Sequence, residues 1–338
     1  MIQYAYMNSI LITGAGGYIG SVATSLLLEK GYAVVAVDNF STGYKAPLDK
    51  LKETYGDALK IYEVDLKGFF SHVFKENTID LVLHYAANCS VNESMEKPEK
   101  YFSNNTGGTQ RLLHTMLDHG VKHIVFSSTC AVYGEAEYVP IDEKHPTRPA
   151  NPYGASKLMS ENIIRWYGKL KGLNYVILRY FNVCGATDDG TIGDSKKPSP
   201  HLMQNAVRGA LGIEPFNLTC GKFDTLDGTP IRDYVNVVDL NVAHILALEY
   251  LISGGKSETI NLGTGDGNSV MEIVQKVMEI TGKKITINHG QERAGEYAKM
   301  IASIKKAQKI LGWKPTHTLQ DSVQSLVDWY KKRPSGWE

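Results

Sequence analysis

Short apolar runs alternate with longer segments of helical periodicity through the first half of the chain. The runs are hydrophobic almost throughout, which is typical of strands buried on both faces of a parallel sheet. The segments between them, such as Gly107–Asp118 and Pro152–Lys171, have the length and pattern of helices. This alternation predicts an α/β protein of the Rossmann type, with a doubly wound parallel sheet. The apolar runs cover residues 9–13, 33–38, 59–65, 79–87, 123–129 and 175–181.

The pattern changes after about Gly185, where a polar, loop-like stretch begins. Strand and helix patterns return at residues 231–252 and 257–282. We therefore expect a nucleotide-binding domain and a smaller, discontinuous α/β lobe. The expected limits are residues 1–183 plus about 234–262 for the domain, and about 184–233 plus 263–338 for the lobe.

Composition narrows the class of protein. The 338 residues are 43% hydrophobic and 21% charged, and the formal net charge is zero, so no nucleic-acid or membrane partner is indicated. No apolar run reaches the roughly 18–20 residues that span a bilayer, and the first eight residues lack the features of a signal peptide. The cysteines are far apart and lack metal-ligand spacing, which predicts reduced thiols in a cytoplasmic protein without a metal site. They are Cys89, Cys130, Cys184 and Cys220.

Glycines stand at Gly14, Gly17 and Gly20, between the first apolar run and the first helical segment. Missing side chains at such a turn allow the backbone to approach a pyrophosphate, and the helix that follows points its N–H groups at the phosphates. Asp38 ends the second run, where a carboxylate can accept hydrogen bonds from an adenosine ribose and would repel a 2′-phosphate. The sequence therefore predicts binding of NAD rather than NADP.

A tyrosine and a lysine four residues apart occur twice, at Tyr153/Lys157 and at Tyr167/Lys171. Spacing alone does not distinguish a catalytic pair from two residues on a helix surface. Pro152 suits the first position of a helix, so Tyr153 and Lys157 would share one helical face, one turn apart.

Several segments, read in order, are similar to motifs of one known family. "TGAGGYIG", "VDNFSTG", "YAANCSV", "SSTCAVYG", "NPYGASK" and "RYFNVCGA" resemble those of the extended short-chain dehydrogenase/reductases. "SMEKPEKYFSNN", "GTPIRDYVNVVDL", "NLGTGDGNSV" and "LGWKP" narrow the resemblance to the UDP-sugar 4-epimerase branch. The resemblance runs from about Ser9 to about Pro334.

The resemblance implies reversible inversion at C4 of a UDP-hexose, UDP-glucose or UDP-galactose, through a transient 4-keto sugar. Tightly bound NAD would take and return hydride, with Thr129, Tyr153 and Lys157 as the catalytic residues and Tyr153 as the base. A free tyrosine has a pKa near 10, so work at neutral pH needs a shift of roughly 3 units, or about 4 kcal/mol. The ammonium of Lys157 and the positive nicotinamide both favour the phenolate. Tyr167 and Lys171 are then given a structural role.

The remaining family contacts carry over residue by residue as expectations. For the substrate the resemblance implies Thr129, Asn182, Leu202, Arg232, Arg293, Glu296 and Met300, with the two arginines on the diphosphate. For NAD it implies Tyr153 and Lys157 together with Gly14, Gly17, Tyr18, Ile19, Gly20, Asp38, Asn39, Phe40, Ser41, Thr42, Gly43, Asp65, Leu66, Tyr85, Ala86, Ala87, Asn104, Tyr180 and Phe181.

The chain departs from the family pattern at several of these places. Cys89 stands where some members have a lysine, His201 replaces an asparagine, and Glu296 replaces an aspartate. Met300 aligns with the position whose bulk is thought to govern entry of N-acetylated sugars. Methionine is bulky, although its side chain is flexible. Its bulk favours plain hexoses as substrates.

Other functions stay open at this stage. A 4-epimerase acting on a UDP-linked N-acetylhexosamine, pentose or uronate has the same motifs. A nucleotide-sugar 4,6-dehydratase needs an acidic pair after the catalytic threonine, whereas Cys130 and Ala131 follow Thr129 here. A non-catalytic, NAD-sensing protein on this fold would be expected to lose the tyrosine or the lysine. Family resemblance also suggests a homodimer.

Overall fold

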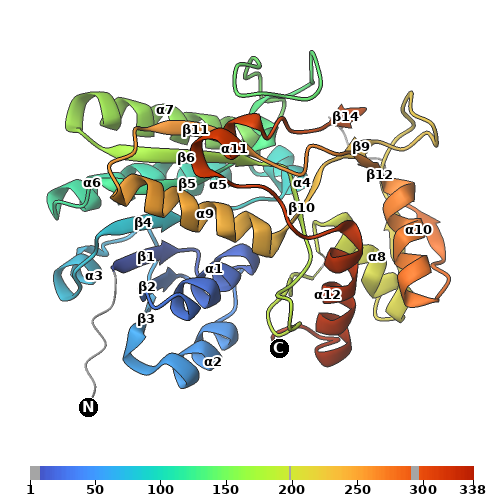
Figure 1. Cartoon of the computed structure of the whole chain (residues 1–338), viewed down its shortest axis with the longest axis horizontal. Coiled ribbons are helices and arrows are strands. Elements are labelled where there is room, and N and C mark those ends of the chain that lie inside the picture. Colours follow the sequence, from blue (N-terminus) through green and yellow to red (C-terminus); the bar gives the residue numbers. More distant parts are fainter. Residues whose placement is uncertain (1–7, 198, 291–296) are drawn as a thin grey trace. The chain divides into compact units, whose positions relative to one another are not determined.

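The protein is described by a computed structural model that covers residues 8–197, 199–290 and 297–338. Within this part of the chain, seven strands form one sheet in the order β11-β6-β5-β4-β1-β2-β3 (Figure 1). Strands β1, β2, β3, β4 and β5 pair in parallel. The predicted Rossmann-type parallel sheet is therefore confirmed. Its strands are β1 (Ser9–Thr13), β2 (Ala33–Asp38), β3 (Leu59–Glu63), β4 (Leu81–His84), β5 (His123–Thr129), β6 (Asn174–Tyr180) and β11 (Glu258–Leu262).

The sheet is buried on both faces, as its apolar runs predict. Leu11 of β1 belongs to a core formed with Leu112 and Leu113 of α6 and Ile164 of α7. Ile10 and Ile12 point to the opposite face, because side chains alternate along a strand, and both are fully buried. The helices that accompany these strands are α1 (Tyr18–Glu29), α2 (Ala46–Tyr55), α3 (Ser71–Glu76), α4 (Val91–Glu96), α5 (Pro98–Tyr101), α6 (Gly108–Asp118), α7 (Pro152–Lys171) and α9 (Val237–Ile252), with a single 3-10 turn at Gly56–Ala58 and a short π-helix at Phe102–Gly107.

The strand order reverses between β1 and β4. Neighbouring parallel strands whose connections run in opposite directions leave a crevice at their carboxyl ends, where ligands of this fold class bind. Thr13 ends β1 and His84 ends β4, and the two residues are paired in register. The glycine-rich turn and Tyr85 follow these strand ends directly.

The second half of the chain contains small sheets and a group of helices. Helices α8, α10 and α12 pack against one another (Figure 1). Three small sheets have the orders β10-β7, β12-β9-β14 and β13-β8. The elements are β7 (Asn182–Cys184), α8 (Leu202–Leu211), β8 (Phe216–Leu218), β9 (Ile231–Arg232), β10 (Tyr234–Asn236), β12 (Asn268–Ser269), α10 (Val270–Thr281), β13 (Ile287–His289), β14 (Lys299–Met300), α11 (Lys305–Leu311) and α12 (Leu319–Lys332). A single turn at Cys130–Val132 follows β5 earlier in the chain.

The chain divides into two compact units. The first consists of residues up to 128, 152–178 and 244–259, and the second of residues 129–151, 179–243 and 260–338. This division reflects compactness and does not show where a ligand binds, so the domain limits given above stay a prediction. Across the described ranges, no helix combines the length and apolar character needed to cross a membrane.

Candidate active site

Tyr153 and Lys157 lie in the first two turns of α7, which begins at Pro152 as predicted. The side chains are separated by one helical turn and are both buried, with Tyr153 9% and Lys157 3% exposed. The ring of Tyr153 meets the ring of Tyr101 edge-on, with centroids 6.3 Å apart. Both residues are therefore held in a packed environment within the first unit.

Lys157 is a buried cation without a hydrogen-bond acceptor among the described residues. Its Nζ lies 4.4 Å from the centre of the Phe126 ring, a cation–π contact. Burial lowers the pKa of Lys157 to about 8, and the charges at Cys89 and Glu161 act in the opposite direction. An ammonium that is buried in this way is available for an acceptor from outside the chain.

Glu161 supports this end of α7 and was not identified from the sequence. Its fully buried carboxylate accepts a hydrogen bond from Ser128 Oγ at 2.6 Å and an ion pair from Arg165 at 2.8 Å. Arg165 also donates to Thr259 Oγ1 at 3.2 Å. A signal did exist, because Glu161 follows Lys157 at the same four-residue spacing and therefore continues the same helical face.

The glycine-rich turn between β1 and α1 leaves no room for side chains. Gly14 has φ +73°, and a Cβ there would lie 2.6 Å from the backbone nitrogen of Ala86. A Cβ on Gly20 would lie 2.1 Å from the carbonyl oxygen of Gly14. Gly17 is the N-cap residue of α1, so the N-terminus of this helix opens onto the turn.

Asp38 connects the end of β2 to this turn. Its carboxylate accepts hydrogen bonds from the backbone nitrogens of Gly16 and Phe40, each at 2.8 Å. The residue after it, Asn39, donates to Asp65 Oδ2 at 3.3 Å. The structure therefore brings together the predicted phosphate turn and two carboxylates predicted to contact NAD, Asp38 and Asp65, which come from three different strand ends.

The other predicted NAD contacts of the first unit follow the strand ends. The backbone nitrogens of Tyr85 and Ala86 donate to Thr13, the last residue of β1. Asn104 lies in a short π-helix, Phe102–Gly107, and donates to its neighbour Asn105. Leu66 is buried in the hydrophobic core beside β3. Tyr18, Ile19 and Gly20 form the first turn of α1, and Ser41, Thr42, Gly43 and Ala87 lie in the loops after β2 and β4.

The remaining predicted residues lie in the second unit. Thr129 is buried, and its hydroxyl accepts a hydrogen bond from the nitrogen of Ala131 at 3.1 Å. Phe181 follows β6 and its nitrogen donates to the carbonyl of Leu262. Tyr180 ends β6, Asn182 begins β7 and Leu202 begins α8. The predictions for Arg293 and Glu296 lie outside the described residues.

Arg232 and Met300 are brought together by strand pairing. They occupy matching positions of β9 and β14. The guanidinium of Arg232 donates to the carbonyl of Tyr297 at 2.7 Å and to that of Ile231 at 2.9 Å. The bulky Met300 side chain is 5% exposed. These contacts fix the predicted diphosphate ligand and the predicted sugar-size residue in one small sheet.

Asp233 holds this sheet in place and was also missed from the sequence. Its buried carboxylate accepts hydrogen bonds from Thr264 Oγ1 at 2.8 Å and from three backbone nitrogens. The three nitrogens belong to Thr264, Gly265 and Ala302, at 2.7, 3.0 and 3.1 Å. Asp233 therefore ties the end of β9 to the loop after β11 and to the residue that follows Ile301 beyond β14.

The second Tyr-x-x-x-Lys pair lies at the other end of α7, and its structural role stays a prediction. Tyr167 packs against the hydrophobic core, and Lys171 is exposed at the last position of α7.

The parallel sheet, the glycine-rich turn and the buried tyrosine–lysine pair define a protein of the short-chain dehydrogenase/reductase class. A model of the family described as GDP-mannose 4,6 dehydratase matches residues 11–326. UDP-glucose 4-epimerase of Lacticaseibacillus casei is 43% identical over 97% of this chain and 98% of its own length. The Streptococcus mutans enzyme of that name is also 43% identical, over 98% and 99%. The chain therefore belongs to the UDP-glucose 4-epimerase family.

Solved structures support the same assignment. UDP-glucose 4-epimerase from Bifidobacterium longum, in complex with NAD+ and UDP, superposes with a TM-score of 0.92 at 36% identity, covering 97% of this chain and 99% of that one. The Brucella ovis enzyme, in complex with NAD, superposes with a TM-score of 0.88 at 37% identity, covering 95% and 97%.

Proposed function

We propose that this protein interconverts UDP-glucose and UDP-galactose by inverting C4 of the sugar, with NAD as a retained cofactor. The observation that carries the proposal is the buried Tyr153–Lys157 pair, in the same compact unit as a phosphate-type glycine turn and Asp38. Inversion of an unactivated carbon needs a temporary oxidation and a base. The glycine turn and Asp38 would hold NAD, which is the oxidant, and Tyr153 beside Lys157 is the base.

NAD fits the residues of the first unit. The turn at Gly14 and Gly20 has backbone where side chains would stand, so a pyrophosphate can approach it closely. The carboxylate of Asp38 favours ribose hydroxyls and repels the additional phosphate of NADP. Lys157 has an ammonium without an acceptor among the described residues, and ribose hydroxyls would provide one. When bound, the nicotinamide supplies a reversible hydride acceptor for C4 of the sugar.

Tyr153 acts as the base that takes the proton of the C4 hydroxyl and later returns it. Lys157 keeps most of its positive charge at neutral pH, because its pKa is about 8. A positive charge one turn away stabilises the phenolate form of Tyr153. Thr129 donates a hydrogen bond to the same sugar oxygen. Tyr153 Oη thus accepts one proton and returns it, so the protein has the same protonation state at the start and the end of a cycle.

The second unit binds the nucleotide part of the substrate in this proposal. Arg232 and Arg293 hold the diphosphate, for which a guanidinium is well suited because it can donate two parallel hydrogen bonds. Asn182, Leu202 and Glu296 contact the UDP moiety. Met300 limits the space beside the sugar and so favours plain hexoses.

Two alternatives are weaker. The description of the matching family model favours a 4,6-dehydratase. That reaction needs an acid or base directly after Thr129, and burial raises the pKa of the Cys130 thiol there to about 12. A UDP-linked N-acetylhexosamine, pentose or uronate could replace the hexose without any change in the catalytic residues.

We further propose a homodimer in the cytoplasm. Met159, Trp166 and Leu170 of α7 form an exposed apolar stripe, with Trp166 57% and Leu170 66% exposed. A second copy of the helix would cover it. Light scattering should give a dimer mass that falls to that of a monomer in a Trp166→Lys, Leu170→Lys variant. The four cysteines form no disulfide within the described part of the chain, which suits a reducing compartment.

The central test is product analysis. Purified protein is incubated separately with UDP-glucose, UDP-N-acetylglucosamine and UDP-xylose, and the sugars are separated after each reaction. We expect UDP-galactose from the first and little or no product from the others, with NAD released from the denatured protein in about equimolar amount. A 4-keto-6-deoxy product from any substrate would instead identify a dehydratase.

A further inference from the structure

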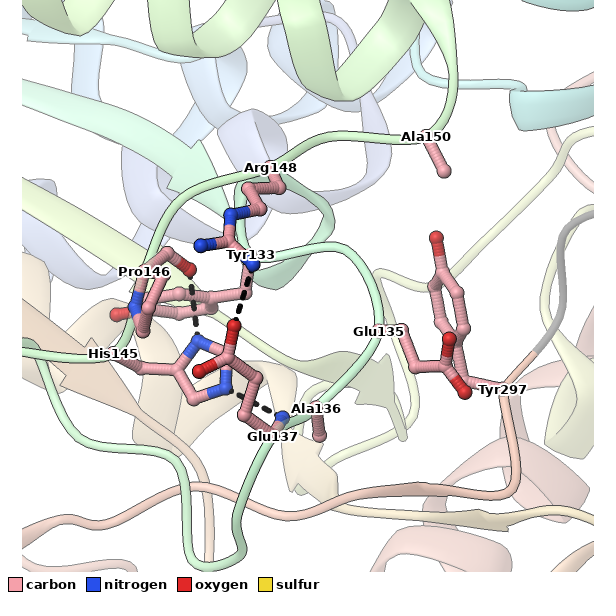
Figure 2. A pocket seen from close by; sticks show the side chains of 9 residues that line it. All are labelled: Tyr133, Glu135, Ala136, Glu137, His145, Pro146, Arg148, Ala150 and Tyr297. Carbon is pink, nitrogen blue, oxygen red and sulfur yellow. Dashed lines mark hydrogen bonds and ion pairs between the residues drawn. The ribbon is translucent and has the colours of Figure 1, made fainter.

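A pocket of about 480 Å³ lies within the second unit and is lined by none of the residues proposed for NAD or for the UDP-sugar (Figure 2). Its walls come from the loop after Thr129, at residues 133–150, and from Tyr297. A volume of this size is in the range that holds small organic ligands. The polar groups of the walls then decide what class of ligand fits.

One wall is already satisfied by its own contacts. Arg148 Nη1 donates to the carboxylate of Glu137 at 2.7 Å. The ring of His145 uses both nitrogens, because Nε2 accepts from the backbone nitrogen of Glu137 at 2.9 Å and Nδ1 lies 2.8 Å from the carbonyl of Pro146. The hydroxyl of Tyr133 donates to Asn261 at 2.6 Å. These contacts occupy both ring nitrogens of His145 and pair the charges of Arg148 and Glu137, so this wall has no net charge to offer a ligand.

The other wall contains polar groups without partners. The hydroxyl of Tyr297 is buried and makes no hydrogen bond within the described part of the chain. The exposed carboxylate of Glu135 lies beside the ring of Tyr297, toward the end away from the hydroxyl, and has neither hydrogen bond nor ion pair to any described residue (Figure 2). Burial, and then the charge of Glu135, raise the pKa of the Tyr297 phenol. A buried hydroxyl without a partner is costly, so a ligand that supplied one would be favoured.

The charge of the pocket selects the ligand further. Glu137 and Arg148 compensate each other, whereas the charge of Glu135 has no counterpart among the lining residues. A phosphate or carboxylate ligand would be repelled, and an ammonium group would be attracted. The Tyr297 hydroxyl can both donate and accept, which suits a sugar hydroxyl.

We propose that this pocket binds an amine-bearing monosaccharide of the hexosamine class, with its ammonium on Glu135 and a ring hydroxyl on Tyr297. None of the residues proposed for NAD or for the UDP-sugar lines this pocket, and the binding proposed here does not require epimerase activity. The ligand binds reversibly and no covalent step is involved.

The test is isothermal titration calorimetry of the holoenzyme with D-glucosamine at neutral pH. Saturating UDP is present throughout, so that the proposed nucleotide-sugar site is filled. D-glucose and D-glucuronate are titrated in parallel, since they have the same ring with no charge and with a negative charge. We expect saturable binding that is strongest for glucosamine, weaker for glucose and weakest for glucuronate.

Two variants and a matched control separate the contributions. Glu135→Gln keeps the size of the side chain and removes its charge, so glucosamine should bind about tenfold more weakly while glucose changes little. Tyr297→Phe removes only the hydroxyl and should weaken both sugars about threefold to tenfold. Tyr138→Phe removes a hydroxyl from the same loop, one that bonds Asp142 outside the pocket, and should change neither.

Absence of saturable glucosamine binding to the folded, UDP-bound protein would overturn the proposal. Unchanged glucosamine affinity in both Glu135→Gln and Tyr297→Phe would do the same. Thermal melting of each variant verifies that it is folded before it is titrated. Because the readout is binding and not turnover, failure here leaves the epimerase proposal untouched, and loss of the epimerase proposal leaves this one testable.

Discussion

The ammonium of Lys157 lies 4.4 Å from the centre of the Phe126 ring, one helical turn after Tyr153. A ring face attracts a cation without neutralising it, so the charge of Lys157 is not consumed by an ion pair. Phe126 belongs to β5 and is fully buried. The ring of Phe126 on the central sheet therefore holds the ammonium of Lys157 in place. The positive charge of Lys157 can then act on Tyr153 and on a bound ribose.

The first prediction concerns this pair. Tyr153→Phe removes the base and should lower kcat by about 10²–10⁴-fold, with a much smaller change in KM. Lys157→Met should lower kcat similarly and should also reduce the amount of NAD that copurifies. Epimerisation of UDP-glucose and the NAD content of denatured protein are the measurements. Tyr167→Phe and Lys171→Met, at the same spacing on the same helix, are the matched controls and should retain activity.

The second prediction concerns Glu161. Glu161→Gln keeps an acceptor for Ser128 but leaves Arg165, which is partly exposed, without its ion pair, so the free energy of unfolding should fall by about 1–3 kcal/mol. Urea denaturation measures this loss. Glu279→Gln, which breaks an exposed pair with Lys276 on α10, should cost less than about 1 kcal/mol.

Glu161→Gln should also change the pH dependence of kcat, which a purely structural role of Glu161 would not do. The negative charge of Glu161 raises the pKa of Lys157, against the larger effect of burial. Its removal should therefore lower that pKa, and the basic limb of the kcat profile should move to lower pH. An unshifted profile would show that Glu161 acts on stability alone.

The third prediction concerns acid sensitivity. His84 is fully buried between Thr13 and Thr109, and burial, followed by the charge of Lys157, lowers its pKa from 6.5 to about 3. The unfolded chain binds a proton at His84 below pH 6.5 and the folded chain does not. Stability from this residue is thus complete above pH 6.5 and declines as the pH falls toward 3, by up to about 1.4 kcal/mol per pH unit.

Denaturation by urea at a series of pH values measures this decline. His84→Gln should flatten the profile between pH 6.5 and 3, although its stability at pH 7 will be lower because two buried threonines lose their partner. His114→Gln, at an exposed position of α6, should leave the slope as it is in the unaltered protein.

The fourth prediction concerns Asp233. Asp233→Asn presents an amide group to a site where three backbone N–H groups converge, so at least one donor loses its acceptor. The free energy of unfolding should fall by about 1–3 kcal/mol, and KM for UDP-glucose should rise because β9 and β14 hold Arg232. Asp266→Asn changes an exposed aspartate of the same loop and should affect neither quantity. Equal behaviour of the two variants would contradict the proposed role of Asp233.

The fifth prediction concerns substrate size. Met300→Ser removes a long side chain at a buried position next to Arg232, so the ratio of kcat/KM for UDP-N-acetylglucosamine over UDP-glucose should rise by about tenfold or more. The ratio is measured with both substrates on the same preparation. If only the N-acetylated sugar reacts with the unaltered protein, the size argument at Met300 is wrong.

The parts that could be predicted from the sequence depend on neighbours along the chain. The apolar runs at β1, β2 and β5 were predicted at their observed bounds, because such runs are recognisable without knowing what packs on them. The start of α7 at Pro152 follows from the restricted backbone of proline. The glycine-rich turn likewise depends on adjacent residues, and it lies where predicted, between β1 and α1.

The parts that were missed depend on residues far apart in the chain. Ser128 meets Glu161 across 33 residues, and Asp233 meets Ala302 across 69. Asn105 donates a hydrogen bond to Ser156, 51 residues away. Asn105 also lies in the π-helix of Phe102–Gly107, and the hydrophobic pattern of the sequence does not predict the wider turn of a π-helix. Such contacts have no local signature, because any buried polar residue could equally be satisfied elsewhere.

The division of each compact unit into three separate stretches of chain limits how the protein can be cut or joined. Helix α9 and strands β6 and β11 each contribute residues to both units. An expression fragment that ends at residue 128, 151, 178 or 243 would therefore encode neither unit in full. A reporter inserted after residue 151, 178 or 243 would interrupt both units. Fusion partners belong at the chain ends, and a split version of this protein would have to be divided within a surface loop and reassembled from two pieces that are each incomplete.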